Sequence, residues 1–270
     1  MTIKKTVRTT LVNVICKFLN KVGDQHLWEK IFRVSLREMN IGTGGNFNHS
    51  GELLVAKFIL EKFNKESQII IFDVGANIGN YSKSLSTLFG NKAKIFSFEP
   101  SKKTFELFIE TTKNFTNIIP NNFGFSDKEY NQILFTNSEG SGLASVYQRR
   151  LDHFGIQMDK TEEIKLTTID TYCVENNIER IHFLKLDIEG HELNVLNGAK
   201  KMINEKQIDF IQFEFGGCNI DSRTFFQDFY YLLKDRYNIY RILKDGIYEL
   251  PTYKETHEIF IPTNYLAIRK

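Results

Sequence analysis

From Gly51 onward, the sequence alternates between stretches with helical periodicity and short apolar stretches typical of buried strands. This alternation predicts a parallel sheet flanked by helices, because a helix is the usual connection between parallel neighbours. The expected strands are 68–74, 94–98, 118–121, 132–136, 164–168, 181–187, 208–215, 237–243 and 265–268, and the expected helices are 27–39, 52–64, 80–89, 102–114, 168–176, 192–204 and 223–235. The pattern therefore predicts an α/β fold with a Rossmann-like, doubly wound sheet.

The first 50 residues do not share this alternation. Between residues 7 and 22, apolar side chains recur at helical spacing among basic ones, which predicts an amphipathic basic helix. Such a helix either docks on an acidic membrane surface or a partner, or packs on the main domain or a second subunit. We favour packing, and the N-terminal helices are candidate dimerisation elements. A Gly-rich loop, 42–51, is a boundary or a lid, so we expect an extension over 1–50 and a single domain over 51–270.

Composition excludes several classes of protein. Of 270 residues, 35 are basic and 33 acidic, so the net charge of +2 lacks the footprint of a nucleic-acid binder. Three distant cysteines without a Cys-x-x-Cys pair indicate a reducing compartment, the cytoplasm. No apolar run approaches the ~20 residues that a membrane span needs, and no cleavage site follows the N-terminal stretch, so we expect neither stable membrane insertion nor a signal peptide.

A glycine-containing turn, FDVGANIGNYS, follows the first expected strand at residues 72–82. Ligands of doubly wound sheets bind where strands end, and Gly75 lets the backbone approach a ligand while Gly79 opens the next helix. The spacing is not the Gly-x-Gly-x-x-Gly of nicotinamide-binding proteins, which makes a nicotinamide-dependent oxidoreductase an unlikely alternative. The charge of Asp73 would oppose a phosphate but suits a cationic cofactor such as S-adenosylmethionine.

The second strand ends in FSFEPS and places Glu99 20 residues after Gly79. An acid at about this distance accepts both ribose hydroxyls in such folds, because a carboxylate has two oxygens for a vicinal diol. This observation fits any adenosine cofactor.

A second acidic group occupies the turn KLDIEGHELNVL at residues 185–196. Because strand ends converge on one cleft, Asp187, Glu189 and His191 are candidate catalytic residues. We predict that His191, or failing that Glu189, deprotonates an acceptor hydroxyl while Asp187 and Glu189 hold its neighbours. In the alternative interpretation, Glu189, His191 and Glu192 only cap and solvate the helix.

Two further features extend the predicted site. Oxygen ligands from Asp187, Glu189 and Glu214 suit a divalent cation, so a metal-assisted methyltransferase acting on another nucleophile stays an alternative, although we predict no resident metal. The polar segment 137–160 has no clear periodicity and is the expected lid over the acceptor. Within it, we interpret Arg149 and Arg150 as surface charge in preference to substrate contacts.

These motifs together resemble the FkbM family of S-adenosylmethionine-dependent methyltransferases. The resemblance rests on FDVGANIGNYS, FEPS, TTIDTYC (167–173) and FLKLDIEGHELNVLNGA (183–199), and it spans about residues 70 to 215. It implies a class I fold with a seven-stranded sheet whose last strand is antiparallel. It also implies O-methylation of a hydroxyl on a sugar, sugar nucleotide, glycan or secondary metabolite.

The same resemblance implies which residues bind the cofactor. Asp73, Gly75, Asn77 and Gly79 would line its methionine end, Glu99 would bind the ribose, and Asn122 and Phe123 would lie beside the adenine. The predicted set also includes Asn80, Tyr81, Pro100 and Asp187.

The chain is rich in phenylalanine, with 24 Phe beside 11 Tyr and one Trp. Most of these rings fall on or beside expected strands, where aromatic residues fit the pleated surface. We therefore expect them to build the scaffold, and only a few aromatic residues, such as Tyr81 and Phe123, to contact a ligand.

Overall fold

The computed structural model describes residues 25–42 and 47–270, and these described residues divide into two compact units on either side of Met39 and Asn40. The first unit contributes helix α2 (Gln25–Glu38), close to the predicted helix. The basic helix predicted within residues 7–22 lies outside the described residues, as does part of the Gly-rich loop. Across the described ranges, every helix is too short or too polar to cross a bilayer.

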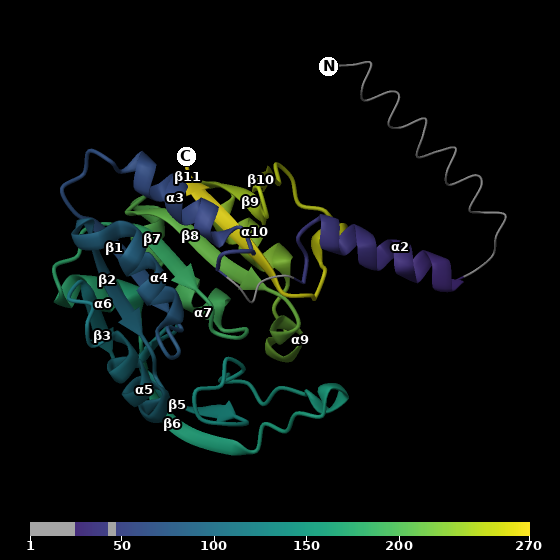
Figure 1. Cartoon of the computed structure of the whole chain (residues 1–270), viewed down its shortest axis with the longest axis horizontal. Helices are drawn as coiled ribbons and strands as arrows, with labels where there is room; N and C mark the ends of the chain where they lie inside the picture. The colour runs from purple at the N-terminus through teal and green to yellow at the C-terminus, as the bar shows by residue number, and fades with distance from the viewer. Residues whose placement is uncertain (1–24, 43–46) are drawn as a thin grey trace, which may run out of the picture. The chain divides into compact units, whose positions relative to one another are not determined.

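The second unit is built on an eight-stranded sheet with the order β10-β9-β11-β8-β7-β1-β2-β3 (Figure 1). Its strands are β1 (Ile69–Val74), β2 (Ala93–Phe98), β3 (Ile118–Asn121), β7 (Ile181–Leu186), β8 (Ile208–Phe215), β9 (Tyr237–Leu243), β10 (Gly246–Glu249) and β11 (Thr263–Arg269). Within this sheet, the neighbouring strands β8, β7, β1, β2 and β3 pair in parallel. Strand β11 is antiparallel to both its neighbours, β8 and β9. This arrangement confirms the predicted class I fold with an antiparallel last strand.

The prediction of seven strands omitted β10. This edge strand pairs with β9 as an antiparallel hairpin, joined by the two-residue turn of Lys244 and Asp245. Its residues 246–249 are mostly exposed and carry no apolar run, so periodicity alone did not distinguish them from a loop.

The helices flank the sheet (Figure 1). They are α3 (Glu52–Lys62), α4 (Asn80–Phe89), α5 (Lys102–Thr112), α6 (Ile169–Glu175), α7 (Glu192–Asn197), α8 (Lys200–Asn204), α9 (Cys218–Ser222) and α10 (Phe226–Leu233), with short 3-10 turns η1 (Gly90–Lys92), η2 (Asp152–Phe154) and η3 (Glu255–His257). The helix predicted over 192–204 is interrupted at Gly198, where a Cβ atom would lie 2.0 Å from the carbonyl oxygen of Ser126. The helix predicted from 223 starts at Phe226, because Arg223 adopts a left-handed φ of 58° that ends α9.

The phenylalanines fill the core on both faces of the sheet. On one face, Phe72 and Phe98 pack with Phe125 and Tyr172, with ring centroids 4.5–6.3 Å apart. On the other face, Phe210 packs against the ring of Phe63, 5.8 Å away. The strand phenylalanines Phe72, Phe96, Phe98, Phe183, Phe210, Phe213 and Phe215 are all buried, which confirms their predicted role as scaffold.

A second, three-stranded sheet lies beside the main one, with the order β4-β6-β5. Its strands are β4 (Gly124–Phe125), β5 (Tyr130–Thr136) and β6 (Lys160–Thr167). β5 and β6 pair antiparallel over their full length, so β6 begins four residues before the predicted strand. The segment between them is the predicted polar segment; it carries η2 and an isolated bridge between Phe135 and Ser145.

Candidate active site

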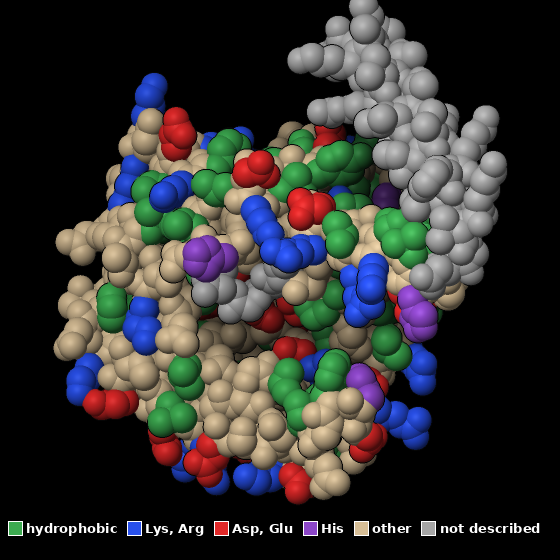
Figure 2. Space-filling view, turned by 45° about the vertical axis from the view of Figure 1, so that its right-hand side comes forward, with side chains coloured by type: hydrophobic (Ala, Val, Ile, Leu, Met, Phe, Trp, Pro, Cys, Tyr) green, Lys and Arg blue, Asp and Glu red, His purple; other side chains and the backbone are tan. Residues whose placement is uncertain are grey.

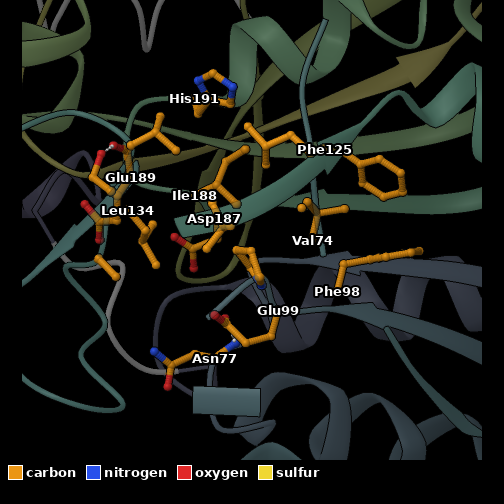
Figure 3. Close-up of a pocket in the computed structure, with 18 of the residues that line it drawn as sticks. Val74, Asn77, Phe98, Glu99, Phe125, Leu134, Asp187, Ile188, Glu189 and His191 are labelled. Atoms are coloured by element: carbon orange, nitrogen blue, oxygen red, sulfur yellow. Dashed lines mark hydrogen bonds between the residues drawn. The ribbon is translucent and has the colours of Figure 1, made fainter. Parts of the chain in front are cut away.

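A cavity lies at the carboxyl ends of β1, β2 and β7 (Figure 3), and the segment after β5 contributes to its wall. Its lining residues are Val74, Gly75, Asn77, Phe98, Glu99, Pro100, Gly124, Phe125, Leu134, Ser141, Gly142, Ala144, Ser145, Val146, Ile164, Leu166, Asp187, Ile188, Glu189 and His191. The carboxyl ends of parallel strands are where ligands of doubly wound sheets bind. The cavity therefore occupies the position that the sequence motifs indicate.

The turn after β1 runs directly against the turn after β7. Gly75 adopts a φ of 83°, and a Cβ atom there would lie 2.0 Å from the carbonyl oxygen of Asp187. The N–H groups of Gly75 and Ala76 both donate to the carbonyl oxygen of Phe98 at 3.0 Å. Only glycine permits this contact, so Gly75 sets the width of the cavity between β1 and β7.

Glu99 presents its carboxylate to the cavity beside Asn77 (Figure 3). One oxygen accepts the N–H of Asn77 at 3.0 Å, and the other accepts the N–H of Ser101 at 2.9 Å. Each oxygen keeps a second lone pair, so the group can still accept hydroxyl donors. Burial raises the pKa of Glu99 to about 7, although the two N–H donors oppose this rise.

One half of the cavity wall is apolar and comes from both sheets. Phe98 contributes from β2, Phe125 from β4, and Ile164 and Leu166 from β6. An apolar wall of this kind suits the flat ring of a nucleobase.

The predicted adenine neighbours Asn122 and Phe123 do not line the cavity. The Asn122 amide donates to the carbonyl oxygen of Glu99 at 2.9 Å, and Phe123 packs on Phe98 with centroids 5.5 Å apart. The next two residues, Gly124 and Phe125, line it instead, because they form β4 beside the second sheet.

Asp73 does not reach the cavity, contrary to the role expected from its charge. Its side chain is fully buried, accepts a hydrogen bond from Ser82 at 2.6 Å and lies 3.5 Å from the Lys185 ammonium. Asp187 does line the cavity, and its side chain is 45% exposed and lies 3.1 Å from Lys185. Of the two aspartates, Asp187 is therefore the one available to a cationic ligand.

Lys185 is the cation that holds these two acids. Burial alone would lower the pKa of its ammonium, but Asp187, Asp73 and Glu52 raise it overall. The ammonium also lies 4.3 Å from the centroid of the Tyr81 ring.

The predicted cofactor residues Gly79, Asn80 and Tyr81 do not line the cavity. They stand at the start of α4, where Gly79 packs against the side chains of Thr112 and Phe108.

Three carboxylates gather at the open side of the cavity. Oxygen atoms of Asp187, Glu189 and Glu214 lie within 4.8 Å of one another, and acidic side chains are visible in the hollow in Figure 2. Burial, reinforced by the neighbouring acids, raises the pKa of Glu214 well above its usual value. Such a set can ligate a divalent cation. Lys185 and Arg149 already contact two of these three carboxylates. That the site holds no resident metal stays a prediction.

Arg149 is not surface charge, contrary to our interpretation of the sequence. Its side chain is only 8% exposed, contacts the Glu189 carboxylate and lies 3.9 Å from Asp221. Burial raises the pKa of Glu189 to about 8, while Arg149 opposes the rise. The polar segment is thus joined to the acidic turn.

His191 is placed at the cavity but is not free to act as a base. Its Nε2 lies 2.9 Å from the Ser126 hydroxyl, and its Nδ1 lies 3.0 Å from the Tyr147 hydroxyl. Burial lowers the pKa of His191 to about 4, so the ring is neutral at pH 7. Both nitrogens already have partners, and a group with this pKa is a weak base, so the geometry favours a structural role.

Glu192 supports the acidic turn and does not cap the helix as the alternative interpretation expects. Its carboxylate accepts the N–H of Ile188 at 2.9 Å and the N–H of Gly190 at 3.0 Å. Both donors precede α7, and the N-cap residue His191 makes no side-chain capping hydrogen bond.

The low pKa of His191 predicts how the stability of the protein depends on pH. An unfolded histidine titrates near 6.5, so between pH 6.5 and 4 the unfolded chain takes up a proton that the native protein does not. Wild type should therefore lose stability relative to His191→Gln as pH falls, by about 2 kcal/mol between pH 7 and 5. Urea unfolding of both proteins at the two pH values measures the difference, and a difference independent of pH would contradict the assignment.

Residues 73–241 match the methyltransferase FkbM domain, a span of more than half of the chain. The chain belongs to the FkbM methyltransferase family. This FkbM protein is 28% identical over 167 residues to the hexuronic acid methyltransferase AglP of Haloferax volcanii, covering 62% of the chain and 64% of AglP. It is 22% identical over 174 residues to the 2-O-methyltransferase NoeI of Sinorhizobium fredii, covering 61% of the chain and 70% of NoeI.

Among solved structures, the FkbM protein is similar to precorrin-6y C5,15-methyltransferase from Geobacter metallireducens GS-15. The TM-score is 0.40 at 10% sequence identity, over 80% of this chain and 88% of that one.

The motifs located part of the cavity and missed the rest. The predicted residues that line it are Gly75, Asn77, Glu99, Pro100, Asp187, Glu189 and His191. The missed ones come mostly from the second sheet and the segment before β6. The alternation at Ile164 and Leu166 was a usable signal, because it marks one buried face of a strand.

Proposed function

We propose that this chain is an S-adenosylmethionine-dependent O-methyltransferase that acts on a hydroxyl of a sugar or glycan. The observation that carries the proposal is the Glu99 carboxylate, which faces a cavity at the carboxyl ends of the parallel strands with lone pairs left for a ribose. Family membership supports methyl transfer, and the names of AglP and NoeI support a sugar acceptor.

The residues present fit this cofactor. Glu99 would accept the ribose hydroxyls, Phe98 and Phe125 would flank the base, and Asp187 would face the positively charged end. The glycine at position 75 keeps the backbone out of the space between them. When bound, S-adenosylmethionine supplies an electrophilic methyl group.

The chain's own residues would handle the acceptor at the open side of the cavity. A sugar hydroxyl is a poor nucleophile and needs a base within hydrogen-bond reach. Of the two predicted bases, Glu189 fits better than His191, because burial raises its pKa to about 8, close to working pH. Asp187 would orient neighbouring hydroxyls, and the cover over the cavity would exclude water from the methyl transfer.

Two measurements test the proposal. Calorimetric titration with S-adenosylhomocysteine should show binding by the wild-type chain. Radiolabelled methyl transfer from S-adenosylmethionine should then be assayed on methyl glycosides of hexuronic acids and of neutral hexoses. Absence of binding would sink the cofactor assignment, whereas binding with label found only on non-hydroxyl nucleophiles would sink the O-methyltransferase assignment.

The raised pKa of Glu99 predicts a pH-dependent affinity. Ionised Glu99 accepts hydroxyl donors with both oxygens, and protonation removes part of this capacity, so affinity should rise as pH increases through 7. Glu99→Gln should weaken S-adenosylhomocysteine binding by about 2–3 kcal/mol, as expected for hydrogen bonds to a charged group, and should flatten the pH dependence. Calorimetry at pH 6 and 8 on both proteins is the check. An equal pH dependence in the variant would assign it to another group.

A further inference from the structure

We propose that Arg149 is a positioning residue, which ties the cover of the cofactor cavity to Glu189, so that the cofactor exchanges through a state in which this contact is broken. We call residues Gly140–Arg149 the roof. The inference rests on the proposed function, because it concerns the same cavity, and it adds a coupling between cofactor exchange and the acidic turn.

The roof forms one wall of the cavity. Ser141, Gly142, Ala144, Ser145 and Val146 all line it. Apart from the bridge between Ser145 and Phe135, this stretch has no helix or strand, so its position depends on contacts made by side chains. A wall of this kind can move without unfolding either sheet.

The first contacts join the roof to the turn after β1. The side-chain amide of Asn77 donates to the carbonyl oxygens of Ser141 at 2.9 Å and Gly140 at 3.3 Å. Asn77 also donates its backbone N–H to Glu99. This end of the roof is thus anchored beside the predicted ribose site.

A second set of contacts joins the roof to the acidic turn after β7. The Ser145 hydroxyl donates to the carbonyl oxygen of Glu189 at 2.8 Å, and the Tyr147 hydroxyl lies 3.0 Å from His191. Arg149 contacts the Glu189 carboxylate. Both the backbone and the side chain of Glu189 are therefore held by the roof, and Glu189 is held in a left-handed conformation with a φ of 54°. Opening the roof would release Glu189 at the same time.

Charge makes Arg149 the decisive member of this set. Glu189 lies within 4.8 Å of the Asp187 and Glu214 oxygens, and Arg149 is the cation that contacts its carboxylate, whereas Lys185 contacts Asp187. Arg149 is itself imperfectly held: its buried Nε finds no hydrogen-bond acceptor among the described residues, and Asp221 is 3.9 Å away. A buried donor without an acceptor weakens the closed state and makes opening accessible.

The test measures S-adenosylhomocysteine dissociation by stopped-flow fluorescence and amide hydrogen exchange of the roof, on the full chain. Arg149→Gln should raise the dissociation rate constant at least tenfold and increase exchange of residues 140–147. Arg149→Lys should give values between those of the wild type and Arg149→Gln, because lysine keeps the positive charge but lacks the planar guanidinium that pairs with a carboxylate. The matched control is Arg150→Gln, since Arg150 is the adjacent exposed arginine, and it should stay within twofold of wild type.

The outcomes separate this inference from the proposed function. If the wild-type chain does not bind S-adenosylhomocysteine, the proposed function fails. If it binds, but Arg149→Gln matches Arg150→Gln in dissociation rate and exchange, the inference is overturned. A merely structural Arg149 would lower the melting temperature without a selective rise in either readout. Should Arg149→Gln fail to fold, Glu189→Ala breaks the same contact because it removes the carboxylate, and an unchanged dissociation rate there is equally decisive.

Discussion

Replacing Gly75 by alanine is expected to weaken S-adenosylhomocysteine binding by at least 100-fold. The added Cβ atom would lie 2.0 Å from the carbonyl oxygen of Asp187, a contact with backbone that no rotamer change relieves. The turn would have to move away from β7, which changes the separation of Asp187 and Glu99 across the cavity. Binding sites lose affinity steeply when their groups are displaced by about 1 Å. Calorimetric titration measures the loss, with circular dichroism to show that the variant is folded.

Gly155→Ala is the matched control for this experiment. Gly155 also has a positive φ, 69°, but a Cβ atom there meets nothing within 4 Å. The variant Gly155→Ala therefore has the conformational cost of alanine at positive φ without a clash of its Cβ atom. Its affinity should equal that of wild type, and an affinity of Gly75→Ala within threefold of wild type would contradict the role of the turn.

Replacing Lys185 by methionine is expected to destabilise the protein by about 3–5 kcal/mol, the cost of removing one partner from a buried ion pair. The Lys185 ammonium is buried between Asp73 and Asp187, and Asp73 is fully buried. Without the cation, Asp73 keeps only the Ser82 hydroxyl as a partner for its charge. Urea unfolding at pH 7 measures the change in the free energy of unfolding.

Lys57→Met provides the comparison, because Lys57 is exposed in the middle of α3. Its free energy of unfolding should stay within about 0.5 kcal/mol of wild type, as is usual for surface substitutions. A loss below 1 kcal/mol for Lys185→Met would contradict the stabilising role of the buried pair of Lys185 and Asp73.

The sheet and one side of the cavity followed from local patterns. Strand stretches such as Ile118–Asn121 and Ile208–Phe215 were predicted with the bounds that the structure has. Buried parallel strands are continuous apolar runs, which are easily recognised, and their carboxyl ends must meet at one edge. For the same reason Gly75, Glu99 and Asp187 were correctly placed at one cavity.

The position and the partners of each polar side chain depended on contacts between distant residues, which no local sequence pattern encodes. Asp73 and Asp187 both end strands, yet only Asp187 lines the cavity, because Ser82 and Lys185 hold the Asp73 side chain away from it. His191 stands in a motif typical of catalysis, but Ser126 and Tyr147, 65 and 44 residues away, occupy its nitrogens.

The sequence by itself determined the α/β sheet, the glycine turn after the first strand and the acidic residues at the strand ends. Each of these features depends on residues within about 20 positions of one another. The tertiary structure decided which acids are paired, which segment lines the cavity beside them, and which residues form its apolar wall. Those outcomes depend on the pairing of β5 with β6 and on the contact between Arg149 and Glu189, 40 residues apart. Such long-range contacts are selected by the packing of the whole domain, so the free energy that fixes them is absent from any single segment.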